Sequence, residues 1–80
     1  MEQIEVTARF DAHGKITPLG FVWKGRVNRV ESIGRNWKAD DGFHILVMTR
    51  GNKAYHLLFK PDKVCWYLLR GGGVPAVPMV

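Results

Sequence analysis

The sequence has a single cysteine, Cys65, so no internal disulfide can form and packing alone must stabilise the 80 residues. It also has no apolar run near the roughly 18 residues that a membrane-spanning helix needs. The first ten residues, MEQIEVTARF, lack the basic and apolar segments of a secretory signal peptide. These absences predict a cytoplasmic protein with no membrane partner.

Recognisable catalytic and metal-binding motifs are missing as well. Cys65 lies in the apolar run VCWYLL, where a free cysteine usually acts as a small hydrophobic residue rather than as a nucleophile. The adjacent carboxylates of Asp40 and Asp41 have no partner pair, and RGGGVP lacks the strand-to-helix context of a phosphate-binding loop. We therefore predict a non-enzyme without catalytic residues, metal, cofactor or small-molecule substrate.

The residues that are present give the composition of an ordinary globular domain, with 46% hydrophobic and 24% charged residues. A chain of this length buries roughly 60% of the surface that it exposes when unfolded, which leaves room for one core. Three glycines and two prolines follow Arg70. We therefore predict one domain over residues 1–70 and a flexible Gly- and Pro-containing tail over residues 71–80.

Hydrophobic alternation predicts strands along most of the chain. In IEVTARFD, apolar residues alternate with polar ones, as in a strand with one buried face. AHGK follows as a turn, which predicts a hairpin with the next strand. After a predicted turn at residues 60–63, VCWYLL is apolar on both faces, which is typical of a central or barrel-closing strand.

Residues 21–37 are harder to assign because their apolar period changes. The predicted apolar face up to residue 28 comprises Phe21, Trp23, Gly25 and Val27, and the opposite face comprises Val22, Lys24, Arg26 and Asn28. After Val27 the apolar spacing becomes three, three and four, which fits either a helical turn or a bulged strand. The β-branched residues and Gly34 disfavour a helix, so we predict a bent or bulged strand.

The segment FHILVMTRGNKAYHLLFK predicts a hairpin whose register follows from its polar pattern. A three-residue loop at Gly51, Asn52 and Lys53 gives one nearly all-apolar face and gathers the polar groups on the other. In this register His44 and His56 lie two cross-strand pairs apart, about 13 Å along the strands. They are therefore predicted not to bind one metal ion together.

Tight turns between short strands predict an all-β domain. We expect a small antiparallel meander or a partly closed barrel, SH3-like or OB-like, with about five strands and a Gly/Pro-rich C-terminal tail. Both barrel types occur in nucleic-acid and peptide binders, although a fold alone assigns no function.

The spacing of the aromatic residues resembles that of a known family. Phe21-x-Trp23-x-Gly25-Arg26, a later Trp37 and Trp66-x-Leu68 look like the pattern in short bacterial domains of unknown function, some of which are attached to DNA-repair polymerases of the Y family. The resemblance covers residues 21 to 69 or so, and Asn28 stands where the pattern has an aromatic residue. It implies a DNA context and carries over no catalytic residue.

Positive charge is concentrated in one part of the sequence. The net charge is +5, and residues 12–39 contain six Lys and Arg residues and a single acid, Glu31. Clustered cations suit a phosphate-tracking surface because each cation near a phosphate releases counterions, and Trp37 beside them can stack a base. The predicted nucleic-acid-binding residues are Lys24, Arg26, Arg29, Arg35, Trp37 and Lys38. The competing interpretation is a solvated basic face that keeps the protein soluble.

Two classes of function follow from the sequence. The first is a non-catalytic accessory module that binds DNA or RNA through the basic stripe. The second is a protein-interaction or homodimerisation module that uses an exposed strand edge or an apolar sheet face. The clustered cations favour the first class.

Overall fold

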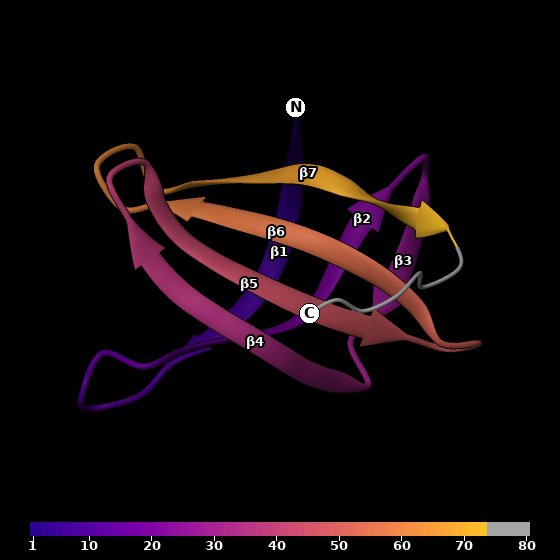
Figure 1. Cartoon of the computed structure of the whole chain (residues 1–80), viewed down its shortest axis with the longest axis horizontal. Helices are drawn as coiled ribbons and strands as arrows, with labels where there is room; N and C mark the ends of the chain where they lie inside the picture. The colour runs from indigo at the N-terminus through magenta and orange to yellow at the C-terminus, as the bar shows by residue number, and fades with distance from the viewer. Residues whose placement is uncertain (74–80) are drawn as a thin grey trace.

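The computed structural model describes residues 1–73, which form seven strands joined by short turns and connections (Figure 1). The strands are β1 (Glu2–Phe10), β2 (Ile16–Trp23), β3 (Arg26–Arg29), β4 (Ser32–Ala39), β5 (Gly42–Thr49), β6 (Lys53–Lys60) and β7 (Cys65–Gly73). Among these residues no helix is long and apolar enough to cross a membrane.

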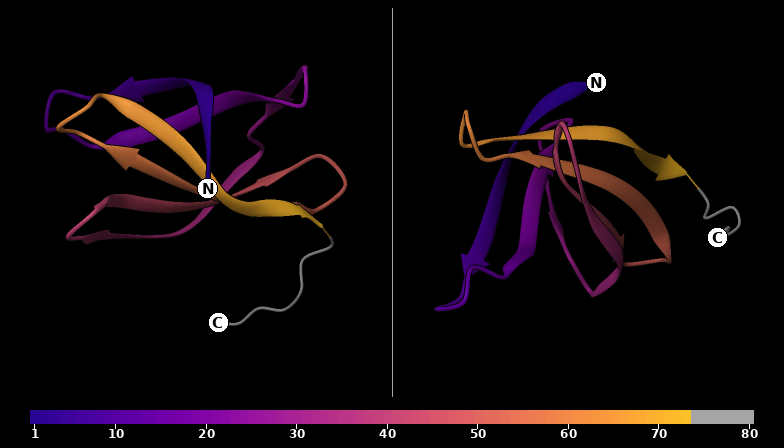
Figure 2. Two further views of the ribbon diagram at one scale, coloured as in Figure 1. Left: turned by 90° about the horizontal axis from the view of Figure 1, so that it is seen from above. Right: turned by 60° about the vertical axis from the view of Figure 1, so that its left-hand side comes forward.

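All seven strands belong to one sheet with the order β3-β2-β1-β7-β6-β5-β4, and every neighbouring pair is antiparallel. The sheet curls into a half-barrel in which β1 to β3 cross behind β4 to β7 (Figures 1 and 2). The predicted all-β, antiparallel and partly closed architecture is confirmed. The predicted number of about five strands is wrong, because β3, β4 and the end of β2 stand where one bulged strand is predicted.

The core lies on the concave inner face of the curled sheet. Along β5 and β6, its buried side chains alternate with residues that point to the opposite, outer face. Phe21 of β2 packs edge-on against Tyr55 of β6, with ring centroids 4.9 Å apart, and so joins the two sides of the half-barrel. The buried core residues are Phe21, Ile45, Val47, Tyr55, Leu57, Phe59, Trp66 and Leu68.

A tight turn at Lys24 and Gly25 interrupts the segment that is predicted as one strand. Both residues have positive φ angles, 53° and 74°, and Trp23 pairs with Arg26 across them. Two consecutive left-handed residues form a two-residue hairpin turn whose twist matches that of the flanking strands. The chain therefore folds back as β3 on β2 instead of continuing forward.

This turn also changes which face each side chain of β3 occupies. Directly paired residues of antiparallel strands share a face, so Arg26 lies on the side of Trp23 and Asn28 on the side of Phe21. Val27, which is predicted in the core, lies on the other side and is 80% exposed. The predicted separation of apolar and polar faces is therefore wrong for β3.

The chain changes its pairing partner between β3 and β4. The amide of Val30 donates to the carbonyl of Leu19 in β2, whereas the next amide, that of Glu31, donates to the carbonyl of Met48 in β5. β4 then pairs with β5 alone and forms one edge of the sheet, with a register shift between residues 33 and 36. The irregularity that the sequence predicts within residues 27–37 is thus located in β4.

The predicted β5–β6 hairpin is present, but its loop lies one residue nearer the N-terminus, at residues 50–52. Gly51 and Asn52 both have positive φ angles and close the loop there. Every cross-strand pair is therefore displaced by two residues from the predicted register, which preserves the two faces and changes the neighbours. As a consequence, His44 and His56 become diagonal neighbours on the outer face.

The C-terminal strand follows the predicted turn at residues 60–63, where the amide of Lys63 donates to the carbonyl of Lys60 over 3.2 Å. β7 lies between β1 and β6, in agreement with its predicted central position. It extends to Gly73, so the glycines that are predicted to begin the tail belong to a strand. The rest of the predicted tail, residues 74–80, lies outside the described residues.

Candidate functional site

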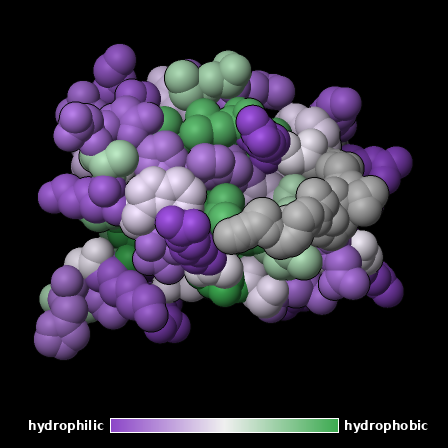
Figure 3. Space-filling view, viewed as in Figure 1, coloured by the Kyte–Doolittle hydropathy of each residue, from purple (hydrophilic) through white to green (hydrophobic). Residues whose placement is uncertain are grey.

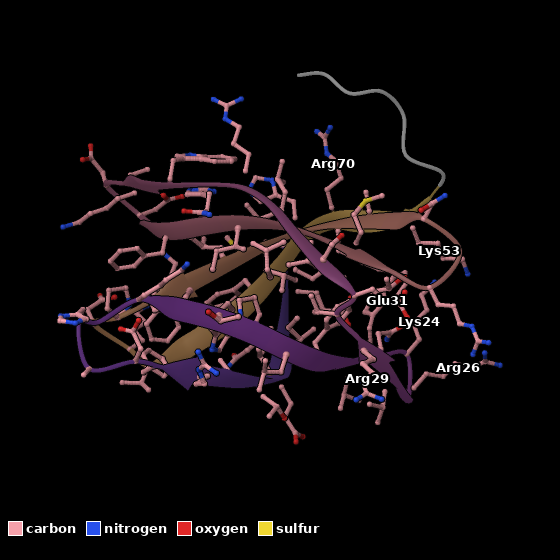
Figure 4. The ribbon with its side chains drawn as sticks, turned by 90° about the horizontal axis from the view of Figure 1, so that it is seen from below. Lys24, Arg26, Arg29, Glu31, Lys53 and Arg70 are labelled. Atoms are coloured by element: carbon pink, nitrogen blue, oxygen red, sulfur yellow. The ribbon has the colours of Figure 1, made fainter. Side chains whose placement is uncertain are left out.

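The six predicted binding residues are all exposed and occupy two elements at opposite edges of the sheet. Lys24, Arg26 and Arg29 lie on the β2–β3 hairpin and are called the hairpin cluster below. In the view of Figure 4, the labelled side chains of this cluster lie toward one end of the molecule. The other three predicted residues belong to β4. The predicted stripe is thus divided between β3 and β4.

Aromatic packing supports the hairpin cluster from below. The ammonium of Lys24 lies over the Trp23 ring, 4.6 Å from its centroid. Trp23 in turn contacts Tyr55 edge-on at 5.7 Å and donates from Nε1 to Glu2 over 3.3 Å. The cations of this hairpin therefore project from a turn that is anchored to the core.

Trp37 forms a flat platform on the outer face of β4. Its ring stacks on the imidazole of His44, with centroids 5.0 Å apart and planes inclined by 7°. The guanidinium of Arg35 lies over the same ring, 5.2 Å from its centroid. Trp37 is 36% exposed and His44 only 8%. The histidine therefore supports the indole from the protein side, and the other indole face is directed at solvent and Arg35.

Lys38 is directed to the inner side of β4. It pairs with Phe43, and its ammonium lies over the Phe43 ring, 5.7 Å from the centroid. An open groove of about 510 Å³ lies there between β4 and the β1–β2 hairpin. Trp37 and Lys38 line this groove from β4, and Lys15 lines it from the hairpin. The groove thus adjoins the platform and has one cation on each wall.

Two histidines and an aspartate beside Trp37 form a chain of hydrogen bonds. His44 Nδ1 lies 2.8 Å from His56 Nε2, and His44 Nε2 lies 2.7 Å from Asp41 Oδ1. The predicted separation of the two histidines, about 13 Å, is therefore wrong. Sequence reasoning misses this cluster because its distances depend on a one-residue difference in loop position. The one feature of the sequence that points to this cluster is the three-residue spacing of Asp41 and His44 at the β4–β5 turn.

Charge and burial set the protonation of this chain. The hydrogen bond from His44 holds the pKa of Asp41 below its usual value. Burial lowers the pKa of His56, and the nearby His44 and Arg70 lower that pKa further, while Asp41 opposes them. At neutral pH, Asp41 is therefore a carboxylate and His56 a neutral imidazole.

The platform and the histidines continue as a row of polar side chains across four adjacent strands. Arg35 and Trp37 lie on β4, His44 on β5, His56 on β6, and Arg70 pairs with His56 from β7. These five residues are called the outer-face row. Figure 3 views β4 to β7 from this side and shows hydrophilic side chains around small apolar spots. The surface is therefore predominantly polar.

The basic side chains are not neutralised by neighbours. Within residues 1–73, none of the twelve Lys and Arg side chains lies within ion-pair distance of a carboxylate, and the one contact of that length there is the hydrogen bond between His44 and Asp41. Cations without an internal partner remain available to an external anion. The electrostatics of the molecule therefore suit a negatively charged ligand.

Other candidate chemistry has less geometric support. In the described part of the chain, no group of three or more His, Cys, Asp or Glu side chains is placed to hold a metal ion. Cys65 is half-buried, and its Sγ contacts the amide of Gln3 at 3.4 Å and the carbonyl of Lys63 at 3.2 Å. The thiol therefore has local structural contacts.

In comparisons with known proteins, no family model, curated protein or solved structure matches the chain. The resemblance to the short domains found with Y-family polymerases stays a prediction.

Proposed function

We propose that the protein is a non-catalytic module that binds single-stranded DNA or RNA through the outer-face row and the hairpin cluster. The observation that carries this proposal is the Trp37 platform, a partly exposed indole that stacks on His44 and has the guanidinium of Arg35 over its ring. Stacking of a base on an aromatic side chain contributes about 1–3 kcal/mol per base. A platform that is already in place avoids the cost of ordering the side chain on binding.

The position of Arg35 suits the second face of a stacked base. Its guanidinium lies over the Trp37 ring, 5.2 Å from the centroid and within cation–π range, so a base enters when this exposed side chain moves away from the ring. A base that enters between the two would be stacked on the indole below and on the planar guanidinium above, as in other single-strand binders. Duplex DNA keeps its bases stacked on one another, so this mode favours single strands.

Phosphate contacts would come from the cations around the platform. Arg70 lies at the other end of the outer-face row, Lys38 lies beside the groove, and the hairpin cluster lies at the far edge of the sheet. Because these cations have no carboxylate partner within residues 1–73, no ion pair has to break before phosphate binds. This supports binding that depends on salt but not on sequence.

Protein interaction through the free edge of β4 is the second candidate. All eight residues of this edge strand are exposed, and such an edge can pair with a strand of a partner. However, the register shift between residues 33 and 36 and the charges of Arg35 and Lys38 are features that protect edges from pairing. Nucleic-acid binding is therefore the better-supported proposal.

Fluorescence anisotropy of a labelled ten-nucleotide dT strand tests the proposal, at about 50 and about 200 mM salt. Trp37→Phe keeps an aromatic ring on His44 and should bind nearly as well as the wild type. Trp37→Leu keeps an apolar cover but removes the stacking plane, and should weaken binding by about 5- to 150-fold. Equal loss in both variants, or none in either, contradicts a stacking role.

Paired arginine variants test the phosphate contacts. Arg29→Gln in the hairpin cluster and Arg9→Gln on β1 remove the same charge from exposed strand positions. Only Arg29→Gln should weaken binding. It should also reduce the slope of log affinity against log salt concentration by about one for each lost phosphate contact. Absence of binding by the wild type at the lower salt would exclude the proposed function and favour a protein partner.

A further inference from the structure

His56 and Arg70 stand opposite each other on neighbouring strands, next to the Trp37 platform. They are cross-strand partners of β6 and β7, and a register shift after His56 places Arg70 on the same outer face. Figure 4 shows the Arg70 side chain projecting away from the sheet. No carboxylate of residues 1–73 lies within ion-pair distance of it. The two side chains therefore lie next to each other on the outer face, and no carboxylate among the described residues neutralises the charge of Arg70.

The hydrogen-bond chain decides which nitrogen of His56 stays available. Ionised Asp41 can only accept, so Nε2 of His44 carries a hydrogen. In the neutral tautomer of His44 that this leaves, Nδ1 accepts from Nε2 of His56. In neutral His56 the remaining nitrogen, Nδ1, carries a lone pair and has no hydrogen-bond partner among the described residues. Protonation of this Nδ1 would create a new donor and leave both existing hydrogen bonds in place.

The groups packed around His56 oppose that protonation in the free protein. Burial lowers the pKa of His56, His44 on β5 and Arg70 on β7 lower it further, and Asp41 in the β4–β5 turn partly compensates. From β4, the uncharged Trp37 ring lies 5.4 Å from the His56 ring, with Arg35 over the indole. An anion between His56 and Arg70 would offset the Arg70 charge and stabilise the imidazolium.

We propose that His56 and Arg70 form a phosphate subsite, in which Nδ1 of His56 takes up one proton when a phosphate binds. The inference rests on the function proposed above and describes how that site is regulated, because it makes nucleic-acid binding tighter at acidic pH. By linkage, the affinity for nucleic acid rises once the pH falls below the pKa that His56 has in the complex. The affinity stops rising once the pH is below the lower pKa that His56 has in the free protein. Each unit between these two values corresponds to about a tenfold gain in affinity.

NMR titration of the histidine ring protons tests the subsite without nucleic acid. The pKa of His56 is measured in sodium sulfate and in sodium chloride of equal ionic strength, since sulfate stays a dianion over the pH range used. We expect sulfate to raise the pKa of His56, and to leave that of His13, an exposed histidine in the β1–β2 turn, unchanged. Equal His56 values in the two salts, or an equal rise at His13, would overturn the subsite.

Two variants separate the subsite from a general salt effect. Arg70→Gln should raise the pKa of His56 in chloride, because a neighbouring positive charge is gone, and should abolish its response to sulfate. His56→Gln can still donate a hydrogen bond to His44 but cannot take up a proton. A sulfate response that persists in Arg70→Gln contradicts the proposed partnership.

The dT strand then distinguishes failure of the subsite from failure of the proposed function. Wild-type affinity should rise about tenfold between pH 7.5 and pH 5.5, and the affinity of His56→Gln should change much less. If the wild type and His56→Gln both bind tightly and neither affinity changes with pH, the subsite is refuted and the proposed nucleic-acid binding is retained. A sulfate response at His56 without any binding of the strand supports the subsite and refutes the nucleic-acid function.

Discussion

At the scale of single residues, the backbone conformation of Val64 is unusual. Its φ angle is 53°, in the left-handed region that disfavours L-residues and especially those with a branched β-carbon. Asn52 and Lys24 share this conformation, but asparagine tolerates it and Lys24 lies in a two-residue hairpin turn. The Val64 side chain is 76% exposed, so burial does not offset the strain.

Replacement of Val64 by asparagine should therefore stabilise the protein. We expect Val64→Asn to raise the free energy of unfolding by about 1 kcal/mol, because asparagine adopts the left-handed region at lower cost. Urea unfolding followed by tryptophan fluorescence measures the change. Lys63→Asn is the matched control, because Lys63 lies one residue earlier in the same turn and has an ordinary φ angle. A gain of equal size in both variants would show that the effect is not due to the backbone strain.

At the scale of elements, strand β7 approaches β6 so closely that one position requires glycine. A β-carbon on Gly71 would lie 2.9 Å from Cγ and 3.1 Å from Cα of Tyr55, which is closer than van der Waals contact allows. Tyr55 is buried and packs against Phe21 and Trp23, so it has little room to move. The glycine thus permits the close packing of β7 on the core.

Substitution of Gly71 by alanine should weaken this packing. We expect Gly71→Ala to lower the free energy of unfolding by about 1–3 kcal/mol, as overpacking of a core typically does. Gly34→Ala on β4 is the matched control, since its nearest neighbour would be the carbonyl oxygen of Leu46 at 3.4 Å. The midpoints of urea unfolding compare the two. An undiminished midpoint in Gly71→Ala would mean that β7 can move away from Tyr55 at little cost.

The elements also show what the sequence could predict. Alternation over residues 4–10 and in the β5–β6 hairpin correctly indicated strands and their faces, because one-sided burial imposes a period of two. The Lys24-Gly25 turn was missed because lysine is rarely the first left-handed residue of a hairpin. A two-residue change of register leaves each side chain of the hairpin on the same face of the sheet, but it changes the distances between side chains on the two strands. The faces of the β5–β6 hairpin were therefore predictable, and the contact between His44 and His56 was not.

At the scale of the whole molecule, repulsion between like charges should limit stability. The net charge is +5, and no Lys or Arg within residues 1–73 is paired with a carboxylate. Added salt screens repulsion over a Debye length of about 10 Å at 0.1 M and has few attractive pairs to weaken. Stability should therefore increase when salt is added at low ionic strength.

Thermal unfolding by circular dichroism checks this expectation at neutral pH. Between about 20 and about 300 mM sodium chloride, the Tm should rise by several degrees, since about 1 kcal/mol corresponds to roughly 4–8 °C in a domain of this size. The charge-reducing variant Arg9→Gln should show a smaller rise. A Tm that falls with salt would instead reveal stabilising ion pairs in solution.

The order of the strands has a consequence for how the chain folds during synthesis. β1 leaves the ribosome first, yet one of its two neighbours is β7, which leaves last. The two strands meet over only three residue pairs, Glu2 with Leu68, Gln3 with Tyr67 and Ile4 with Trp66. Until those pairs form, β1 to β3 and β4 to β7 are separate sheets with open edges. Completion of the sheet is therefore a late, long-range event that waits for the last of the seven strands.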